Sequence, residues 1–411
     1  MKIWLINHYA VPPQYYPLAR PSLFAKNLIK AGHDVTVIAA STVHNSESVN
    51  LITDGQRVKR ITDDGIPYVL INCTPYQGNG MKRVLNIRDF AKRLPKVLDT
   101  LERPDAAVAT SFDPISCCEG IRYARKHGIK AVAEIADLWP ETLVAYKGVS
   151  PANPIVKYLR RVEKSIYTQA DRIVFTMEGA YDYIKEQGWE HDVPRDKVFC
   201  INNGIDLEQF DRNREVFRTE DADLMNNGLF KVVYTGAIRR VNNIDKLLDI
   251  AKKVNEPRVR FLIWGSGDEL ERLKERQRSE NIDNVVFKGW VKKENIPYIT
   301  GSADLNLVHN EASPLFRFGI SFNKIFDYMA AGRPILCDFS AKYNPVLKEG
   351  AGFSVESGDV DDIARKIDEL SRQPAQELLG TASAARSAAQ KYDFSVLTSE
   401  LLGVIEGIED K

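Results

Sequence analysis

The residues best suited to chemistry lie in one stretch, 313–338, which reads SPLFRFGISFNKIFDYMAAGRPILCD. Unpaired N–H groups and a partial positive charge make a helix N-terminus a binding site for phosphate. Gly319 permits close backbone approach there, and Lys324 adds a point charge in the first predicted turn. Asp327 lies one turn further on the same face, where it could accept hydrogen bonds from both hydroxyls of a ribose. The spacing favours a nucleoside-diphosphate site, although a capped core helix with a solvated Asp and Lys also fits it.

Two glycine turns follow predicted strands in the same half, YTGAIRRVNN and WGSGDELERL. In the first, Arg239 and Arg240 could clamp phosphate oxygens, because a guanidinium offers paired donors in a fixed geometry. The second contains Gly265 and Gly267 but lacks the third glycine of a dinucleotide-binding fingerprint. Both turns are also compatible with tight β–α connections that touch no ligand.

Candidate residues in the first half follow predicted strands as well. Asp137, in EIADLWPE, comes at the carboxyl end of a strand, where ligands of parallel sheets bind, or else it caps the following helix. His8 and Arg20 flank the first predicted β–α loop. His33 follows a glycine helix stop and is expected to be a turn residue. His309 lies near the predicted phosphate loop, but we do not expect it to be catalytic.

The elements that position these residues alternate between short apolar strands and helices almost throughout the chain. Val- and Ile-rich strands in a β–α–β order indicate parallel sheets covered on both faces. The polar stretch 211–228 shows no strong periodicity and is interpreted as a domain junction. We therefore predict an α/β protein with two doubly wound domains, 1–205 and 206–390, and a C-terminal helix within 391–411 that packs back toward the first domain.

Composition excludes several classes of function. The chain has 411 residues, 44% of them apolar and 27% charged, which is typical of a soluble protein with two domains. The net charge is zero, so nothing points to nucleic acid. Five cysteines without metal-ligand spacing indicate reduced thiols. The start MKIWLINHY reads as a strand, not a signal peptide, and no apolar run is long enough to span a membrane, so a cytoplasmic location is expected.

Two amphipathic basic stretches could rest on an anionic membrane. Six basic residues lie between 82 and 99, where Val84, Ile87, Ala91 and Leu94 share a face and Pro95 should end or kink the helix. In 153–167, Ile155, Leu159, Val162 and Ile166 share a face, with four basic residues off it. Both patterns are also those of a helix packed on a core with a solvated face.

The order of several motifs resembles the GT-B glycosyltransferases, specifically the retaining glycosyltransferase family 4. VYTG, FLIWGSG, NVVFKGWV, ADLNLV, FDYMAAGRPIL and GFSV follow that family across about residues 230–370, and FAKNLIKAGHDVTVIAA, DLWPETL, ADRIVFTMEGA and VFCINNGIDLEQF match in the first half. HYA, TPYQGNGMKRVLN and FGISFNKIFDYMAAG are similar to bacterial transferases that build surface polysaccharides, such as the N-acetylfucosaminyltransferase type.

The resemblance implies two Rossmann-like domains facing across a cleft and transfer of a sugar, with retention, from a nucleotide sugar, expected to be UDP-linked. The acceptor would be a glycan or a polyprenyl-diphosphate-linked glycan, with peripheral contact to the inner face of the cell membrane and no bound metal or cofactor. Catalytic roles would fall to Asp137, Lys324 and Arg240, and acceptor-side roles to His8 and Arg20. The nucleotide-sugar site would comprise Gly236, Arg239, Gly265, Gly267, Trp290, Val291, Phe318, Gly319, Ile320, Ser321, Asn323 and Asp327.

The chain departs from the family pattern at three places. Asp327 stands where the family has the ribose-binding Glu, but Gly319 stands where it has the first acid of that pair. Ala136 replaces the family's His before Asp137, and Ala237 and Asn242 replace an Arg and a Lys. These departures leave two alternatives open, a nucleotide-sugar 2-epimerase-like enzyme and a non-catalytic nucleotide-sugar-binding subunit.

Overall fold

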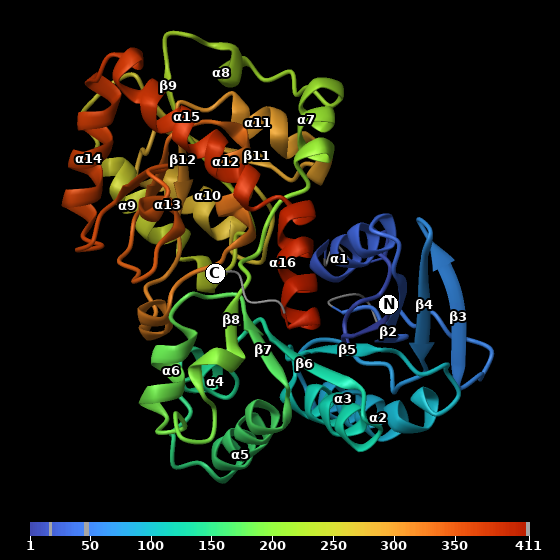
Figure 1. Cartoon of the computed structure of the whole chain (residues 1–411). Helices are drawn as coiled ribbons and strands as arrows, with labels where there is room; N and C mark the ends of the chain where they lie inside the picture. The colour runs from blue at the N-terminus through green and yellow to red at the C-terminus, as the bar shows by residue number, and fades with distance from the viewer. Residues whose placement is uncertain (16–18, 45–48, 408–411) are drawn as a thin grey trace. The chain divides into compact units, whose positions relative to one another are not determined.

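The structure is a computed structural model, and it describes residues 1–15, 19–44 and 49–407 (Figure 1). The chain forms two compact units, Met1–Asn202 with Phe394–Lys411, and Asn203–Asp393. Each unit is built on one sheet with helices packed against it. The predicted α/β class with two Rossmann-like domains is therefore confirmed.

The first unit is built on an eight-stranded sheet in the order β3-β4-β2-β1-β5-β6-β7-β8. Its strands are β1 (Lys2–Ile6), β2 (Asp34–Ala40), β3 (Val58–Asp63), β4 (Ile66–Ile71), β5 (Ala106–Thr110), β6 (Lys130–Ile135), β7 (Arg172–Phe175) and β8 (Val198–Cys200). Neighbouring strands pair in parallel except β3, which runs antiparallel to β4 at the edge. All five residues of β5 are buried, as expected for a central parallel strand.

Helices cover the sheet of the first unit. They are α1 (Ala19–Lys30), α2 (Met81–Leu98), α3 (Pro114–Lys126), α4 (Glu141–Lys147), α5 (Pro154–Gln169), α6 (Ala180–Glu186) and α16 (Phe394–Glu406), with a short 3₁₀ turn at Arg195–Lys197. Helices α1 and α16 lie side by side, and the Phe24 and Phe394 rings meet edge to face at 5.3 Å (Figure 1). The last helix of the chain therefore completes the core of the first unit.

The second unit is built on a six-stranded parallel sheet in the order β11-β10-β9-β12-β13-β14. Its strands are β9 (Phe230–Thr235), β10 (Val259–Trp264), β11 (Val285–Gly289), β12 (Leu305–Val308), β13 (Ile335–Cys337) and β14 (Gly352–Ser354). Because the order reverses between β9 and β12, the carboxyl ends of these two strands meet at the point where ligands of open parallel sheets bind.

The helices of the second unit include two that the sequence analysis missed. They are α7 (Leu207–Val216), α8 (Ala222–Met225), α9 (Ile244–Lys253), α10 (Leu270–Ser279), α11 (Ile296–Gly301), α12 (Asn323–Ala331), α13 (Pro345–Lys348), α14 (Val360–Arg372) and α15 (Ala375–Lys391), with 3₁₀ turns at Arg240–Asn242, Lys293–Asn295 and Pro314–Phe318. The stretch 211–228, interpreted as a junction, lies inside the second unit, which begins at Asn203, and it contains α8 and part of α7. Asp206 and Asp221 cap these two helices, and Phe210 and Leu224 bury them.

Both amphipathic stretches are helices, but their buried faces differ from the predicted ones. Helix α2 does not end at Pro95, since Val97 and Leu98 are buried and hold its last turn on the core. Val84 is exposed, although Ala91 and Leu94 are buried as expected. In α5, Ile155 is exposed while Val156 is buried. Among the described residues, no helix is long and apolar enough to cross a membrane.

Candidate functional site

The predicted phosphate site is built from the β9 loop and the start of α12. Lys324 lies in the first turn of α12, and its Nζ stands 4.2 Å from the centroid of the Tyr234 ring on β9. A Cβ added to Gly236 would lie 3.0 Å from the same Nζ. The structure therefore brings Lys324 and Gly236 together, 88 residues apart in the numbering of the chain. The glycine leaves room for the ammonium group beside the loop.

Tyr234 is a residue of this site that the sequence analysis missed. Its hydroxyl donates to the carbonyl oxygen of Ala237 at 3.1 Å, while its ring supports the Lys324 ammonium by a cation–π contact. The loop that follows carries Arg239 and Arg240, both exposed. Within the described part of the chain neither guanidinium makes a hydrogen bond or an ion pair. Two unneutralised arginines, three and four residues after Gly236, make this loop suited to an anionic group.

The glycines of the WGSG turn are explained by close packing of two loops. A Cβ on Gly265 would lie 1.8 Å from the carbonyl oxygen of Gly236, and one on Gly267 would lie 2.0 Å from that of Ile238. The backbones are also joined by the bonds from Gly236 N–H to Trp264 O (3.0 Å) and from Ile238 N–H to Ser266 O (2.9 Å). These glycines hold the arginine loop directly against the next loop. Their contact with a donor stays a prediction.

The loop before α12 is more buried than a phosphate cradle would be. Phe318 and Ile320 are buried, and Gly319 N–H already donates to Phe316 O at 3.1 Å. Gly319 has φ +102°, which a side-chain-bearing residue rarely adopts, so the backbone itself explains why no acid stands here. Ser321 Oγ accepts from Asn203 N–H at 2.8 Å. Of the predicted binding residues between Phe318 and Asn323, only Asn323 is exposed.

Asp327 lies one turn below Lys324 on α12 and is partly buried. Burial raises the pKa of its carboxyl, and the positive charges of Lys293 and Lys324 oppose that rise. No hydrogen bond occupies the carboxylate among the described residues, so it is available to accept from hydroxyls. Lys293, the second residue after the KGWV motif, was missed because a lysine in a polar loop gives no signal of its own.

Trp290 and Val291 take different environments after β11. The Trp290 side chain is 67% exposed, which is unusual for the largest apolar side chain. Val291 packs against the small core cluster that contains Trp264 and Ile299. An exposed indole anchored by a packed neighbour can stack on a planar ring, so the geometry is compatible with the predicted contact to a nucleobase.

The acceptor-side candidates of the first unit are both buried. Arg20 Nε donates to Glu134 at 2.9 Å, and its other nitrogens donate to the carbonyl oxygens of Ile201 and Asn202. His8 Nε2 lies 2.7 Å from Asn86 Oδ1, and burial lowers the His8 pKa to about 3. Arg20 has the contacts of a structural residue. Their roles toward an acceptor stay predictions.

Asp137 follows β6 and its side chain is exposed. It does not cap α4, whose N-cap is Pro140. A second acid, Asp113, follows β5, the strand next to β6, and was missed. It caps α3 by accepting from Ser116 N–H at 2.7 Å, and burial raises its pKa to about 6. The alternative in which Asp137 caps α4 is therefore excluded. Asp113 is the residue that caps a helix here, and that helix is α3.

Comparison with known proteins agrees with this architecture. Residues 218–391 match the family described as "Glycosyl transferases group 1", and residues 23–209 match "Glycosyltransferase Family 4". The chain belongs to the group 1 and family 4 glycosyltransferases. Lys324, Asp327, Gly236 and the arginine loop all lie in the group 1 match, whereas His8 and Arg20 precede the family 4 match.

Bacterial relatives and a solved structure extend the comparison. The chain is 26% identical to the probable glycosyltransferase WbjE of Pseudomonas aeruginosa, over 61% of this chain and 61% of that protein, so the match spans about three fifths of the relative. It is 21% identical to the putative colanic acid biosynthesis glycosyl transferase WcaI of Escherichia coli K12, over 68% of this chain and 70% of the relative. The structure of Anabaena Alr3699/HepE in complex with UDP-glucose superposes with a TM-score of 0.67 at 14% identity, covering 99% of this chain and 100% of that one. This likeness shows the fold, which is GT-B as predicted.

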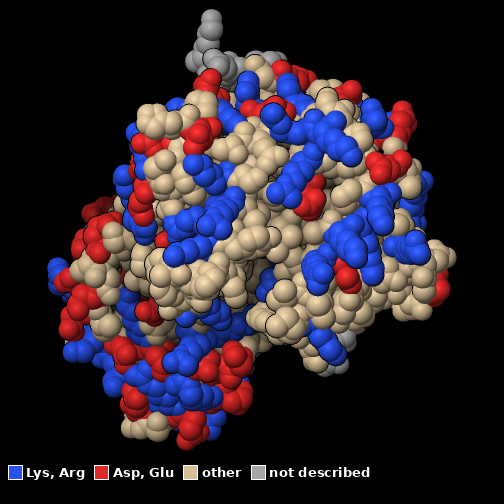
Figure 2. Space-filling model, turned by 90° about the horizontal axis from the view of Figure 1, so that it is seen from below, with Lys and Arg blue, Asp and Glu red and all other residues tan. Residues whose placement is uncertain are grey.

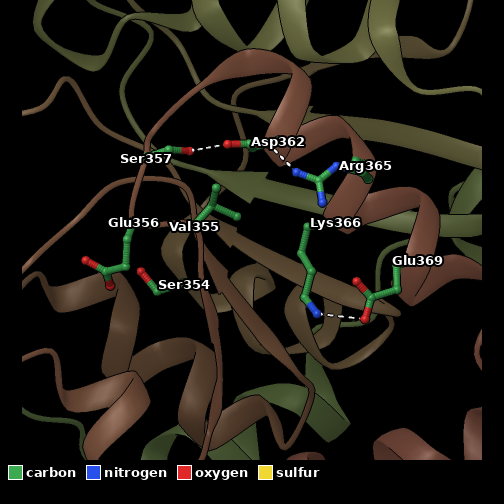
Figure 3. Close-up of a pocket in the computed structure, with 8 residues that line it drawn as sticks. All are labelled: Ser354, Val355, Glu356, Ser357, Asp362, Arg365, Lys366 and Glu369. Atoms are coloured by element: carbon green, nitrogen blue, oxygen red, sulfur yellow. Dashed lines mark hydrogen bonds and ion pairs between the residues drawn. The ribbon is translucent and has the colours of Figure 1, made fainter.

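A shallow polar depression of the second unit lies between the end of β14 and α14 (Figure 3). Its charged residues largely neutralise one another, since Arg365 pairs with Asp362 and Lys366 pairs with Glu369. Ser357 Oγ also donates to Asp362 at 2.7 Å. Because these charges already have partners, we assign no ligand to this depression.

Proposed function

We propose that the glycosyltransferase moves a sugar from a UDP-sugar to a glycan or lipid-linked glycan acceptor, with retention, in the synthesis of a bacterial surface polysaccharide. The observation that carries this proposal is the group of cations at the switch point of the second sheet: Lys324 beside Gly236, with Arg239 and Arg240 in the same loop. The UDP-glucose bound to the Anabaena structure and the colanic acid relative support the donor class and the setting.

The donor would be held by groups with complementary charge. The diphosphate would lie by the Lys324 ammonium and the two loop arginines, near the positive end of α12. Asp327, one turn further along, would accept from the ribose hydroxyls, and Trp290 would stack on the uracil. This order of groups follows the order of parts in a nucleotide sugar, phosphate first and base last.

The reaction must stabilise the charge that develops on the leaving diphosphate. The bond between the anomeric carbon and the diphosphate oxygen breaks, and the acceptor oxygen bonds to that carbon on the same face. The acceptor proton passes to the departing phosphate oxygen. Fixed positive groups at Lys324 and Arg240 lower the barrier because they are oriented before the charge appears. With three cations available, the proposal needs no metal. The catalytic role of Asp137 stays a prediction.

Nucleotide release tests the proposal against its alternatives. A panel of UDP-sugars would be incubated with EDTA, with and without a lipid-linked glycan acceptor, while UDP release and sugar identity are followed. Acceptor-dependent UDP release with an α-linked product from an α-linked donor is expected. Isomerised donor without an acceptor would instead identify a 2-epimerase-like enzyme. UDP-sugar binding without any turnover would identify a non-catalytic subunit.

The pH dependence of donor use should follow the Lys324 ammonium. Burial lowers its pKa to about 8, against the opposite effect of the Asp338 and Asp327 carboxylates. The charged form binds phosphate, so kcat/KM for the donor should fall as pH rises through about 8, and the fall in kcat should come at higher pH because bound diphosphate favours the proton. A Lys324→Arg variant should lose this alkaline limb. An unchanged limb in that variant would assign it to another group.

We propose that the first unit contacts the anionic inner face of the cell membrane through α2 and α5. Exposed basic side chains lie on both helices, among them Lys82, Arg88 and Lys92 of α2 and Lys157 and Arg161 of α5. Figure 2 shows the molecule from below, with lysine and arginine side chains interspersed with acidic ones on that face. Both helices also expose apolar side chains near their N-termini: Met81, Val84 and Leu85 in α2, and Ile155 and Tyr158 in α5. Basic side chains around exposed apolar ones are the combination that binds an anionic bilayer surface.

Vesicle sedimentation tests this contact. Binding to phosphatidylglycerol vesicles should exceed binding to phosphatidylcholine vesicles, and Val84→Glu with Leu85→Glu should reduce it about tenfold by removing apolar contact and adding like charge to the membrane. Val396→Glu is the matched control, because Val396 is an exposed valine on α16. Equal binding by both variants would rule out α2 as the contact.

A further inference from the structure

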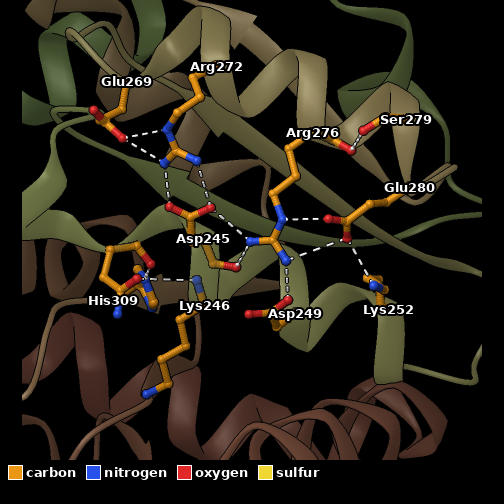
Figure 4. A network of polar contacts seen from close by, with 11 residues as sticks. Asp245, Lys246, Asp249, Lys252, Glu269, Arg272, Arg276, Ser279, Glu280 and His309 are labelled. Carbon is orange, nitrogen blue, oxygen red and sulfur yellow. Dashed lines mark hydrogen bonds and ion pairs between the residues drawn. The ribbon is translucent and has the colours of Figure 1, made fainter.

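A buried histidine–carboxylate pair lies beneath the arginine loop. His309 follows β12 and Asp338 follows the neighbouring strand β13, and both side chains are completely buried. His309 Nδ1 bonds to Asp338 Oδ2, and its Nε2 lies 2.8 Å from the carbonyl oxygen of Asn243. Figure 4 shows His309 next to Asp245 and Lys246 of α9. The pair therefore connects the core of the sheet to the residue at which the loop ends.

The hydrogen-bond partners of this pair determine where its protons lie. The carbonyl of Asn243 can only accept, so His309 Nε2 must carry a proton. The bond at Nδ1 then needs a second proton, which can reside on the imidazole or on the Asp338 carboxyl, and the pair is neutral overall in both cases. Either arrangement keeps the N–H directed at Asn243. His309 thus acts as a fixed donor to the backbone of the loop.

The loop is held at both ends, with its arginines between. At its start, the Ala237 carbonyl accepts from the Tyr234 hydroxyl, and Ile238 N–H donates to the Ser266 carbonyl. At its end, Asn243 has φ +47°, a left-handed conformation for a residue with a side chain, and its carbonyl also accepts from Lys246 N–H at 3.0 Å. The His309 bond restrains this carbonyl from the core side. Without it, the end of the loop would keep only local backbone bonds, such as the one from Lys246 N–H, and the exposed side-chain contact of Asn243 with Glu311.

The same pair also lies next to the Tyr234 ring, which supports Lys324. The His309 and Tyr234 rings meet edge to face with centroids 6.3 Å apart, and Tyr234 is the ring beneath Lys324. Lys246 Nζ donates to the Asp338 carbonyl at 3.2 Å, which joins the first turn of α9 to the same point. Burying a polar pair costs desolvation that an apolar pair would avoid, so its placement here calls for a role besides stability.

We propose that His309 is a positioning residue for donor binding, which fixes the 239–243 loop so that Arg239 and Arg240 face the diphosphate of the nucleotide. This inference rests on the proposed function, since it places the diphosphate at that loop. Flexible arginines would lose conformational freedom on binding, whereas a fixed loop has lost part of it beforehand, which raises affinity for the phosphates. The uridine part of the ligand gains nothing from the His309 contact.

Two substitutions of His309 separate positioning from general stability. Glutamine reaches as far as Nε2 and can donate to Asn243, whereas asparagine reaches only as far as Nδ1. We expect His309→Asn to weaken UDP binding about tenfold and to leave uridine binding unchanged, while His309→Gln stays within about twofold of the wild type for both. Calorimetry measures UDP binding, NMR competition measures uridine binding, and thermal unfolding measures the stability of each variant.

The outcomes distinguish the inference from the function on which it rests. If the wild type binds no UDP, the proposed function fails. If the wild type binds UDP and His309→Asn binds it equally well, or loses UDP and uridine in proportion, only the positioning role is overturned. If both His309 variants unfold, the double variant Arg239→Gln/Arg240→Gln replaces them in the UDP-binding measurement, because it is changed only at exposed residues. Unchanged UDP affinity in that variant would overturn the inference directly.

Discussion

Replacing Lys324 by methionine is expected to lower kcat about 100-fold, the usual cost of removing one preorganised group that stabilises developing charge. Methionine keeps an apolar chain of similar length on the Tyr234 ring, so the loss should report the ammonium and not the packing. The diphosphate gains charge as its bond to the sugar breaks, and Lys324 is the cation fixed by a buried ring beside Gly236. UDP release at saturating donor measures the effect.

A lysine elsewhere on the second unit provides the control. Lys253 lies on α9 and is largely exposed in a surface ion pair with Asp361, a contact of small energetic value. Lys253→Met should leave kcat within about twofold of the wild type, because it removes one charge far from the loop. If Lys324→Met matches this control, Lys324 does not belong to the catalytic group and the phosphate must be met by the arginines alone.

Asp327→Ala is expected to weaken UDP binding about 10- to 100-fold, the equivalent of losing a hydrogen-bonded charged group worth roughly 1.5–3 kcal/mol. The carboxylate is partly buried and has no hydrogen-bond partner among the described residues, so hydroxyls can occupy it without displacing another contact. Removal of the 2′-hydroxyl from the ligand should weaken wild-type binding as well. The two losses should not add, since both remove the same bond.

Calorimetry with UDP and 2′-deoxy-UDP tests that coupling. The wild type should prefer UDP, and Asp327→Ala should bind the two ligands with nearly equal affinity. Asp361→Asn, an exposed acid in the first turn of α14, should keep the wild-type preference. A variant at 327 that still discriminates between UDP and its deoxy form would show that the ribose lies elsewhere.

Regular elements were predictable where burial leaves a clear pattern. The apolar runs of the parallel strands followed from the sequence, because parallel strands are buried on both faces. The edge strand β3 did not, since its exposed lysine and arginine read as loop. Helices α7 and α8 depend on aspartate caps and one or two buried residues. Helix α2 passed through Pro95 because tertiary burial outweighed local preference.

The site was predictable where charge and turn coincide in one segment. Lys324, Asp327 and the arginine loop could be chosen from their own sequence neighbourhoods. Tyr234 could not, because an aromatic residue in a buried strand reads as core until its hydroxyl and ring partners are known. His309 and Asp338 are 29 residues apart and share no motif. Their relation exists only because two neighbouring strands end side by side.

The contact between the two glycine loops has a consequence for engineering donor preference. No side chain fits at 265 or 267, since a Cβ there would fall within 2.0 Å of a backbone oxygen of the facing loop. A mutagenesis library that includes these positions would consist largely of misfolded members. Diversity should be introduced at 237, 241 and 242, where side chains are at least partly exposed. The two loops therefore form a fixed frame, and new specificities have to be selected from the residues that it displays.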